Sequence, residues 1–471
     1  MKRFYRLHAV LYVLIFLSVA VSCINTVKKE TIQKPNILLI NIDDMGWRDV
    51  GYMGSEYYET PNLDALAAEG MIFLNAYAAA SNCAPSRACM MSGQWTPRHG
   101  IYTVNNSDRG RSKDRKLIPT PNNEYMPDDN ILLPEILKEA GYTTCHAGKW
   151  HLSDNPLLRG FDVNIGGCHA GNPGSYYPPY KNVPLEAPSK NYYLTDLVMD
   201  KTLKFINSVD DKPFFLYYSP YAVHTPLHPV KELLQKYNSK QEWNGQSNAK
   251  YATMVENLDT QIGRMIANLK ESGKIKNTLI LFISDNGGVY KITKQWPLRA
   301  GKGSYYEGGI REPMFVYWKE KIEGGTKTDL PVTNIDFFPT ILDAVGINKP
   351  AGKILDGKSI LPVLTNTGAL DERPLFWHFP IYLQSGNKET QDILFRTRPG
   401  SAVRLGDWKF IQYFENNDIE LYNLKEDISE KNNLAESYPG KVKELLNILE
   451  DWREDINAPV PQELNSEYKQ D

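Results

Sequence analysis

Polar side chains follow four apolar runs of this chain that are typical of β-strands, at residues 36–42, 142–147, 213–218 and 278–283. In chain order, these polar residues are Asp43, Asp44, Lys149, His151, His224, Asp285 and Asn286. Ligands of open α/β sheets bind just beyond the carboxyl ends of the strands, so we expect these groups to share one crevice. Carboxylate and amide oxygens suit calcium or magnesium, whereas an amine and imidazoles suit a bound oxyanion.

Each of these groups also has a purely structural explanation. Asp43 and Asp44 could cap a helix or form a turn, and Asp285-Asn286 precedes two glycines in a sequence that favours a turn. His224 stands in a His-Thr-Pro segment that is typical of a loop. Because all of them follow strands, the combination favours a metal and oxyanion site.

Cys83 is a further candidate for chemistry. It stands just before Pro85, a residue that suits the first turn of a helix. The free N–H groups of such a helix start attract anions, and Arg87 lies near the same end. The thiol could be a nucleophile of low pKa, although oxygen suits a neighbouring hard cation better than sulfur. The residues alone therefore predict an activated side chain beside a metal and an oxyanion.

The apolar runs, with another at 313–318, alternate with helical patterns at 132–140, 195–206, 252–269 and 335–345. This alternation predicts an α/β fold with a large mixed, mostly parallel sheet and helices on both faces. After Gly368 the pattern changes to short strands at 375–379, 401–404, 408–413 and 420–423 and an amphipathic helix at 440–453. We therefore expect a catalytic domain at 33–368 and a C-terminal α+β subdomain with an antiparallel sheet at 369–471.

The first residues predict export. Lys2, Arg3 and Arg6 precede an apolar run at 9–21, which is shorter than the roughly 20 residues of a membrane span. The run ends in Ala-Val-Ser-Cys23, which resembles a bacterial lipobox. An ordinary cleaved signal is the alternative. We expect residues 1–23 to direct the chain to the periplasm or outer membrane of a bacterium, with membrane contact only through a lipid anchor.

The composition excludes several classes of protein. Of the 471 residues, 42% are hydrophobic and 23% are charged, which is typical of a globular protein and not of a collagen-like or disordered one. The net charge of −3 argues against a broad basic face for nucleic acid. Five scattered cysteines are too few for a disulfide framework. Pairing among Cys89, Cys145 and Cys168 stays open.

The segment Cys-x-Pro-Ser-Arg-x-x-x-Met-Ser-Gly that begins at Cys83 resembles the signature of type I, formylglycine-dependent sulfatases of the alkaline-phosphatase-like superfamily. The resemblance continues from about residue 35 to the C-terminus. It includes the Asp43-Asp44 pair, the Gly-Lys-Trp-His segment that ends at His151, His224, Asp285-Asn286-Gly and Lys302. It therefore implies the alkaline-phosphatase-like fold and sulfuric ester hydrolysis.

The resemblance also implies a role for each residue. A formylglycine-generating or anaerobic sulfatase-maturating enzyme converts Cys83 to formylglycine, whose hydrate attacks sulfur. One Ca²⁺ is held by Asp43, Asp44, Asp285, Asn286 and the modified Cys83. Lys149 and Lys302 bind the sulfate, and Arg87 orients the hydrate. His224 protonates the leaving alcohol, and His151 takes a proton from the hydrate.

The expected substrate is a sulfated glycan from which an exo-acting enzyme removes sulfate, with galactose or N-acetylgalactosamine sulfate as the sugar. His169 and Tyr176, in a Gly/Pro/Tyr-rich loop at 166–180, either contact that sugar or form an ordinary loop. The basic run at 109–116 either recruits a polyanion or is a solvated loop, and His378 and Arg404 are either sugar contacts or structural. Two rival functions stay open: a phosphatase or phosphonate monoester hydrolase of the same superfamily, and an inactive surface glycan-binding protein.

Overall fold

A computed structural model describes residues 34–210 and 212–469, and Pro35–Asp471 forms one compact unit. The expected signal and lipobox, including Cys23, lie outside the described residues. Among the described helices, none combines the length and the apolar character that crossing a membrane requires.

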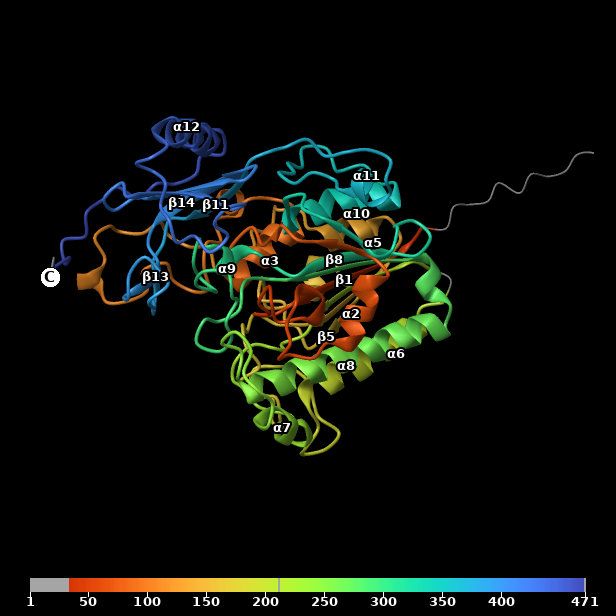
Figure 1. The fold of residues 1–471 in the computed structure, drawn as a ribbon. Coiled ribbons are helices and arrows are strands. Elements are labelled where there is room, and N and C mark those ends of the chain that lie inside the picture. Colours follow the sequence, from red (N-terminus) through yellow and green to blue (C-terminus); the bar gives the residue numbers. More distant parts are fainter. Residues whose placement is uncertain (1–33, 211, 470–471) are drawn as a thin grey trace, which may run out of the picture. The chain divides into compact units, whose positions relative to one another are not determined.

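An eight-stranded sheet forms the centre of this unit (Figure 1). Its strands are β1 (Asn36–Ile42), β2 (Met71–Phe73), β4 (Thr143–Gly148), β5 (Val163–Ile165), β6 (Phe214–Ser219), β7 (Thr278–Ser284), β8 (Met314–Trp318) and β9 (Thr326–Thr328). Their order is β5-β4-β6-β1-β7-β8-β2-β9, and all neighbours are parallel except that β8 is antiparallel to β7 and β2. The predicted mixed, mostly parallel sheet is confirmed.

Helices cover both faces of the sheet, which explains the continuous apolar runs (Figure 1). Leu38, Ile40 and Ile42 of β1 pack in one core, and Ile37 and Leu39 pack in the other. The first core includes α2 (Pro61–Ala68), α6 (Leu194–Ser208), α7 (Lys231–Asn238) and α8 (Ala249–Glu271). The second includes α3 (Cys83–Ser92), α5 (Leu133–Glu139), α10 (Phe337–Val345) and α11 (Leu361–Leu364). The four predicted helices correspond to α5, α6, α8 and α10.

The C-terminal part folds around a second sheet, in the order β11-β14-β15-β16. Its antiparallel strands are β11 (Leu375–Phe379), β14 (Gly400–Leu405), β15 (Trp408–Tyr413) and β16 (Ile419–Asn423). Helix α12 (Pro439–Asp455) contributes Leu445, Leu449 and Trp452 to the core of this sheet. The predicted C-terminal antiparallel sheet is therefore confirmed.

Several short elements complete the fold. They are β3 (Ala76–Tyr77) paired with β10 (Val332–Thr333), β12 (Leu383–Gln384) paired with β13 (Phe395–Thr397), α4 (Thr96–His99), α9 (Glu307–Ile310), and 3₁₀ turns η1 (Gly51–Met53), η2 (Ser112–Asp114), η3 (Pro156–Arg159), η4 (Lys274–Asn277) and η5 (Asn334–Asp336). The four described cysteines are all free, so the structure contains no disulfide among Cys89, Cys145 and Cys168.

Candidate active site

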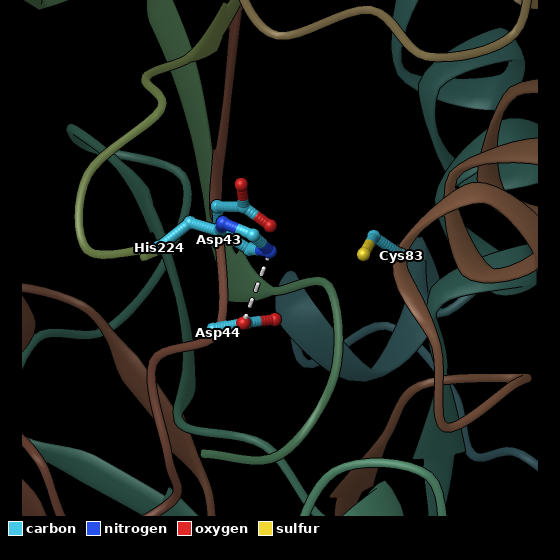
Figure 2. A group of neighbouring side chains, drawn as sticks. All are labelled: Asp43, Asp44, Cys83 and His224. Atoms are coloured by element: carbon cyan, nitrogen blue, oxygen red, sulfur yellow. Dashed lines mark ion pairs between the residues drawn. The ribbon is translucent and has the colours of Figure 1, made fainter. Parts of the chain in front are cut away.

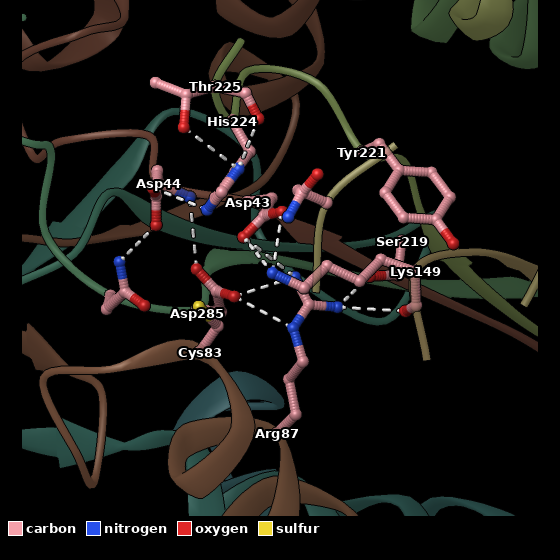
Figure 3. A network of polar contacts seen from close by, with 12 residues as sticks. Asp43, Asp44, Cys83, Arg87, Lys149, Ser219, Tyr221, His224, Thr225 and Asp285 are labelled. Atoms are coloured by element: carbon pink, nitrogen blue, oxygen red, sulfur yellow. Dashed lines mark hydrogen bonds and ion pairs between the residues drawn. The ribbon is translucent and has the colours of Figure 1, made fainter. Parts of the chain in front are cut away.

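The strand order explains why the polar residues meet. Strands β4, β6, β1 and β7 are neighbours in this order and run parallel, so their carboxyl ends lie at one edge of the sheet. The residues that follow them form one polar network (Figure 3). The sequence placed these groups on separate strands, and the sheet brings them together as expected for an open α/β fold.

Cys83 faces this edge from the start of α3. It is the first residue of the helix, and its backbone N–H donates to the side chain of Asn82. Figure 2 shows the sulfur opposite Asp43, Asp44 and His224, and one ligand atom of each of these four residues lies within 4.8 Å of the others. Cys83 is therefore in the same site as the acidic pair.

The Cys83 thiol lies among cations. Its Sγ is 3.1 Å from the Nζ atom of Lys302. Burial raises the pKa of the thiol, but the charges of Lys149 and Lys302 and hydrogen bonds with His151 and His224 outweigh it, so that the pKa lies well below its usual value. A negatively charged group is therefore stabilised at this point.

Two buried ion pairs hold the acidic side chains in place. The Nζ atom of Lys149 donates to both carboxylate oxygens of Asp43 at 2.9 Å. Arg87 donates through Nε to Asp285 at 2.9 Å, and its Nη2 lies 2.7 Å from the same oxygen. Arg87 also donates through Nη1 to the Lys149 carbonyl and to Ser219. Arg87 is therefore a positioning residue for the acids here, in addition to the predicted contact with the hydrate.

The oxygen atoms at this edge fit a hard cation. The Oδ1 atom of Asn286 is buried and has no hydrogen-bond partner in the described residues, while its Nδ2 donates to Asp44 at 2.8 Å. Asp44 accepts from the Asn286 amide, its backbone N–H donates to Asp285 at 3.1 Å, and Asp43 belongs to the same cluster as Asp44. An acceptor without a donor beside three carboxylates is the ligand chemistry of Ca²⁺.

His224 also belongs to the acidic cluster but differs in chemistry. Its Nε2 lies 3.5 Å from Asp44, and Thr225 O lies 2.7 Å from its Nδ1. Burial lowers the pKa of His224, but the charges of Asp44 and Asp43 raise it further, so the net pKa is higher than usual. A raised pKa favours the imidazolium form, which suits a proton donor better than a metal ligand.

The backbone at this edge is strained at two of the predicted residues. Asp44 has φ of 60° and His151 has φ of 68°, in the left-handed region that costs a non-glycine residue of order 1–3 kcal/mol. Gly148 has φ of 110°, and a Cβ atom there would lie 1.9 Å from the Ser219 carbonyl oxygen. Such strain persists where the surrounding structure fixes it, which is common at active sites.

A cavity of about 300 Å³ opens onto these residues. Its lining includes Asp44, Cys83, His151, His224 and Lys302. Sequence analysis did not single out three other residues of the lining, Asn82, Asn172 and Arg396. Asn82 precedes the signature and Asn172 stands in the Gly/Pro/Tyr-rich loop at 166–180, whereas nothing in the sequence around Arg396 indicates a site.

The proposed sugar contacts lie elsewhere. Tyr176 is fully buried and donates its hydroxyl to the carbonyl oxygens of Tyr221 and His224, so it supports the turn that carries His224. This position does not agree with a sugar contact. His169 stacks on Tyr125 at a ring distance of 4.4 Å and lies 6.0 Å from the His151 ring, beside the cavity and outside its lining.

Two C-terminal residues have structural contacts. His378 is buried between Ser401 Oγ at 2.7 Å and the Pro459 carbonyl at 2.9 Å. Arg404 contacts Tyr77 of β3 and the Gly406 carbonyl. Neither residue lines the cavity. Of the two roles that the sequence left open, sugar contact or structural support, the contacts of both residues agree with structural support.

Comparisons with known proteins agree with this geometry. The sulfatase family model matches residues 35–347, and that of the N-sulphoglucosamine sulphohydrolase C-terminal region matches residues 301–455. A sulfatase of Formosa agariphila is 33% identical, over 92% of this chain and 91% of its own length. The N-acetylgalactosamine-6-sulfatase of Rattus norvegicus is 34% identical, over 74% of this chain and 68% of its own.

Solved structures give the same result. The crystal structure of Ps i-CgsB, which was also solved in complex with k-i-k-neocarrahexaose, has a TM-score of 0.74 and 32% identity, covering 89% of this chain and 93% of that one. The phosphonate monoester hydrolase of Agrobacterium radiobacter, at 19% identity and a TM-score of 0.68 over 90% of this chain and 96% of its own, shares the fold. The chain belongs to the sulfatase family of hydrolases.

Proposed function

We propose that this protein hydrolyses an O-sulfate ester of a carbohydrate, using a formylglycine made from Cys83 and one bound Ca²⁺. The observation that carries the proposal is the position of the Cys83 side chain. It lies within 4.8 Å of the acidic pair and 3.1 Å from Lys302, where an oxyanion and a cation can be held together.

Asp43, Asp44, Asp285 and Asn286, with the oxygen of the modified Cys83, would hold the cation. When bound, calcium acts as a Lewis acid toward a sulfate oxygen, and formylglycine supplies a hydrated aldehyde as nucleophile. A formylglycine-generating or anaerobic sulfatase-maturating enzyme is the partner that this modification requires. Its action on Cys83 would precede folding, because this residue is only 3% exposed in the fold and the helix that it begins is buried.

Lys302 and Lys149 oppose the negative charge of the sulfate oxygens. Lys302 lines the cavity and contacts Cys83, so its ammonium group can reach a sulfate held there. Lys149 is fully buried behind Asp43 and acts through its charge. Fixed cations of this kind stabilise the charge that develops on equatorial oxygens during an in-line displacement.

The two histidines differ in protonation, and the difference fits opposite roles. His224 has a raised pKa, and the Thr225 carbonyl accepts from Nδ1–H, so the proton on Nε2 is the one available to a leaving alcohol. Burial lowers the pKa of His151 to about 4, so this side chain is neutral near pH 7 and can accept a proton. We therefore assign His224 as general acid and His151 as general base.

The identity of the sugar is the most specific part of the proposal. One relative is named N-acetylgalactosamine-6-sulfatase, and one similar structure holds a carrageenan-type hexasaccharide. These names support a sulfated galactose or N-acetylgalactosamine as the sugar. We extend the proposal to removal of sulfate from a residue at the end of a glycan. Export to the periplasm or outer membrane would place the enzyme where such glycans arrive.

Sulfate release tests the proposal. The protein is co-expressed with a maturating enzyme and incubated with N-acetylgalactosamine 6-sulfate, galactose 6-sulfate and the matching phosphate esters. We expect release of sulfate in preference to phosphate. Preferred release of phosphate would indicate a phosphatase or phosphonate hydrolase. Saccharide binding without turnover, with Cys83 unmodified in protein from the native host, would indicate a glycan-binding protein.

A further inference from the structure

Two arginines, Arg109 and Arg396, line the same cavity as Cys83. Arg109 donates to the Val104 carbonyl at 3.5 Å. Arg396 donates to the carbonyls of Gln384 at 3.1 Å and Lys302 at 3.4 Å. In residues 34–210 and 212–469, neither guanidinium forms an ion pair with a carboxylate.

Neighbouring arginines of the same segments are paired. In the basic run, Arg111 contacts Asp114 at 2.6 Å, and Arg115 lies 3.8 Å from Asp108 and donates to two carbonyl groups. Arg398 directly follows the strand that carries Arg396, and it contacts both Asp392 and Glu415. Among the described arginines of these two segments, the two that reach the cavity are therefore the ones without a carboxylate partner.

The charges around the cavity do not balance. Among the described residues that line the cavity, Asp44 is the one with a carboxylate. Lys302 and Asn286 already donate to that carboxylate. Burial lowers the pKa of Arg109 and of Arg396, and the charge of Arg109 lowers that of Arg396 further. Two neighbouring cations repel each other, and an anionic ligand between them would relieve this repulsion.

The sulfate that is cleaved does not account for these cations. It is bound at Cys83 by Lys302, with Lys149 behind, so its charge is already opposed. We propose that Arg109 and Arg396 form a second anion subsite, and that the substrate is a saccharide with a second acidic group, sulfate or carboxylate, next to the ester that is cleaved. Planar guanidinium groups bind both kinds of oxyanion through paired N–H donors.

This inference rests on the proposed function and predicts its specificity. A substrate without the second anion leaves both arginines without a partner, and a site with unpaired polar groups discriminates against such a substrate. We expect kcat/KM to be about 10-fold to 100-fold higher for doubly acidic substrates, because hydrogen bonds to charged groups are worth about 1.5–3 kcal/mol.

The experiment compares three substrates of the matured full-length protein: N-acetylgalactosamine 6-sulfate, N-acetylgalactosamine 4,6-disulfate, and the disaccharide of glucuronic acid with N-acetylgalactosamine 6-sulfate. The second and third separate an added sulfate from an added carboxylate. The variants are Arg109→Gln and Arg396→Gln. The matched control is Arg264→Gln, an arginine on the outer side of α8 that pairs with Asp200.

The measured quantity is the ratio of kcat/KM between doubly and singly acidic substrates. We expect this ratio to fall toward one in both cavity variants, mainly through KM, and to stay unchanged in Arg264→Gln. A ratio near one in the unaltered protein, or an unchanged ratio in both variants, would overturn the inference.

Binding separates this inference from the proposed function. Dissociation constants of the same three saccharides are measured by calorimetry on Cys83→Ser protein with and without the arginine substitutions. If no sulfate is released from any saccharide but the doubly acidic ones bind more tightly through Arg109 and Arg396, the proposed function fails and the anion subsite stands. Equal binding of all three saccharides would contradict the subsite.

Discussion

The ammonium group of Lys302 lies between Cys83 and Asp44, with its Nζ atom 3.1 Å from the sulfur and 2.5 Å from the Asp44 Oδ1 atom. At the cavity, this ammonium group joins the helix side of the site to the strand side, as Arg87 of α3 does away from the cavity. Lys149 and Arg87, by contrast, contact the acids from fully buried positions outside the cavity lining. Lys302 is therefore the cation best placed to contact both the nucleophile and the sulfate.

Replacing Lys302 by Met should remove the direct contact with the sulfate while keeping the length of the side chain. We expect kcat to fall about 10²-fold to 10³-fold, as for the loss of one preorganised donor to a developing oxyanion. Steady-state sulfate release measures this loss, and peptide masses check that Cys83 is still converted. An unchanged kcat would show that Lys302 does not contact the sulfate during the reaction.

Replacing Cys83 by Ser should abolish turnover, because serine cannot form an aldehyde hydrate. In the unaltered protein, the peptide that contains residue 83 should lose one sulfur and two hydrogen atoms and gain one oxygen. Mass spectrometry of protein made with and without the maturating enzyme tests both statements. Full turnover by Cys83→Ser, or activity that does not follow the modified fraction, would contradict formylglycine chemistry.

Calcium should stabilise the folded protein. Lys149, Arg87 and Lys302 neutralise the carboxylates in its absence, so the protein should fold without the metal and gain stability when it binds. At a free Ca²⁺ concentration of 100 times Kd, the free energy of unfolding should rise by about 2.7 kcal/mol. Thermal unfolding after EDTA treatment and after addition of Ca²⁺ measures it.

The Asp285→Asn variant is the matched test of this site. It keeps the shape of the side chain but loses a charge that the cation requires, so the increase in Tm with Ca²⁺ should shrink or disappear. Asp200→Asn, on the outer side of α6, should keep the full increase. An equal response of Asp285→Asn and unaltered protein would place calcium elsewhere.

Local sequence predicted those parts of the site that depend on strand ends. Asp43, Asp44 and Asp285 come at the ends of apolar runs, and His224 stands in the loop after one. The position of these residues follows from parallel pairing. Lys302 follows no strand, and only the resemblance indicated it. Arg396 lies on β13, which is too short to show a periodic pattern, and it reaches the cavity through the pairing with β12.

The orientation of a side chain in a loop could not be predicted either. Tyr176 stands in an aromatic loop that suits a sugar, but its ring is buried because its hydroxyl bonds two carbonyl groups of the His224 turn. The basic run contained both paired and unpaired arginines, and nothing in its sequence distinguishes Arg109 from its neighbours. Both outcomes depend on tertiary contacts that are distant in sequence.

The role of His224 should depend on the leaving group. A sugar alkoxide needs a proton when it leaves, whereas a nitrophenolate does not. His224→Ala should therefore lower kcat/KM about 10²-fold to 10⁴-fold for a saccharide sulfate and much less for 4-nitrophenyl sulfate. Equal losses for the two substrates would show that His224 acts in binding or in metal coordination and not as the acid.

His378 should affect the pH dependence of stability and not catalysis. Burial lowers its pKa to about 3, against 6.5 in the unfolded chain, so the unfolded chain binds one more proton between these values. The protein therefore loses stability as the pH falls through this window, at about 1.4 kcal/mol per pH unit for this histidine, and loses none above it.

The His378→Gln variant tests this role, because its amide can still donate to the Pro459 carbonyl, which His378 contacts at 2.9 Å. Between pH 7 and pH 5, the free energy of unfolding should fall by about 2 kcal/mol less in the variant than in the unaltered protein. Urea unfolding at the two pH values measures the difference, and kcat/KM at pH 7 should stay the same. If the pH dependence is unchanged while KM rises, His378 contacts the sugar, and the buried position assigned to it is wrong.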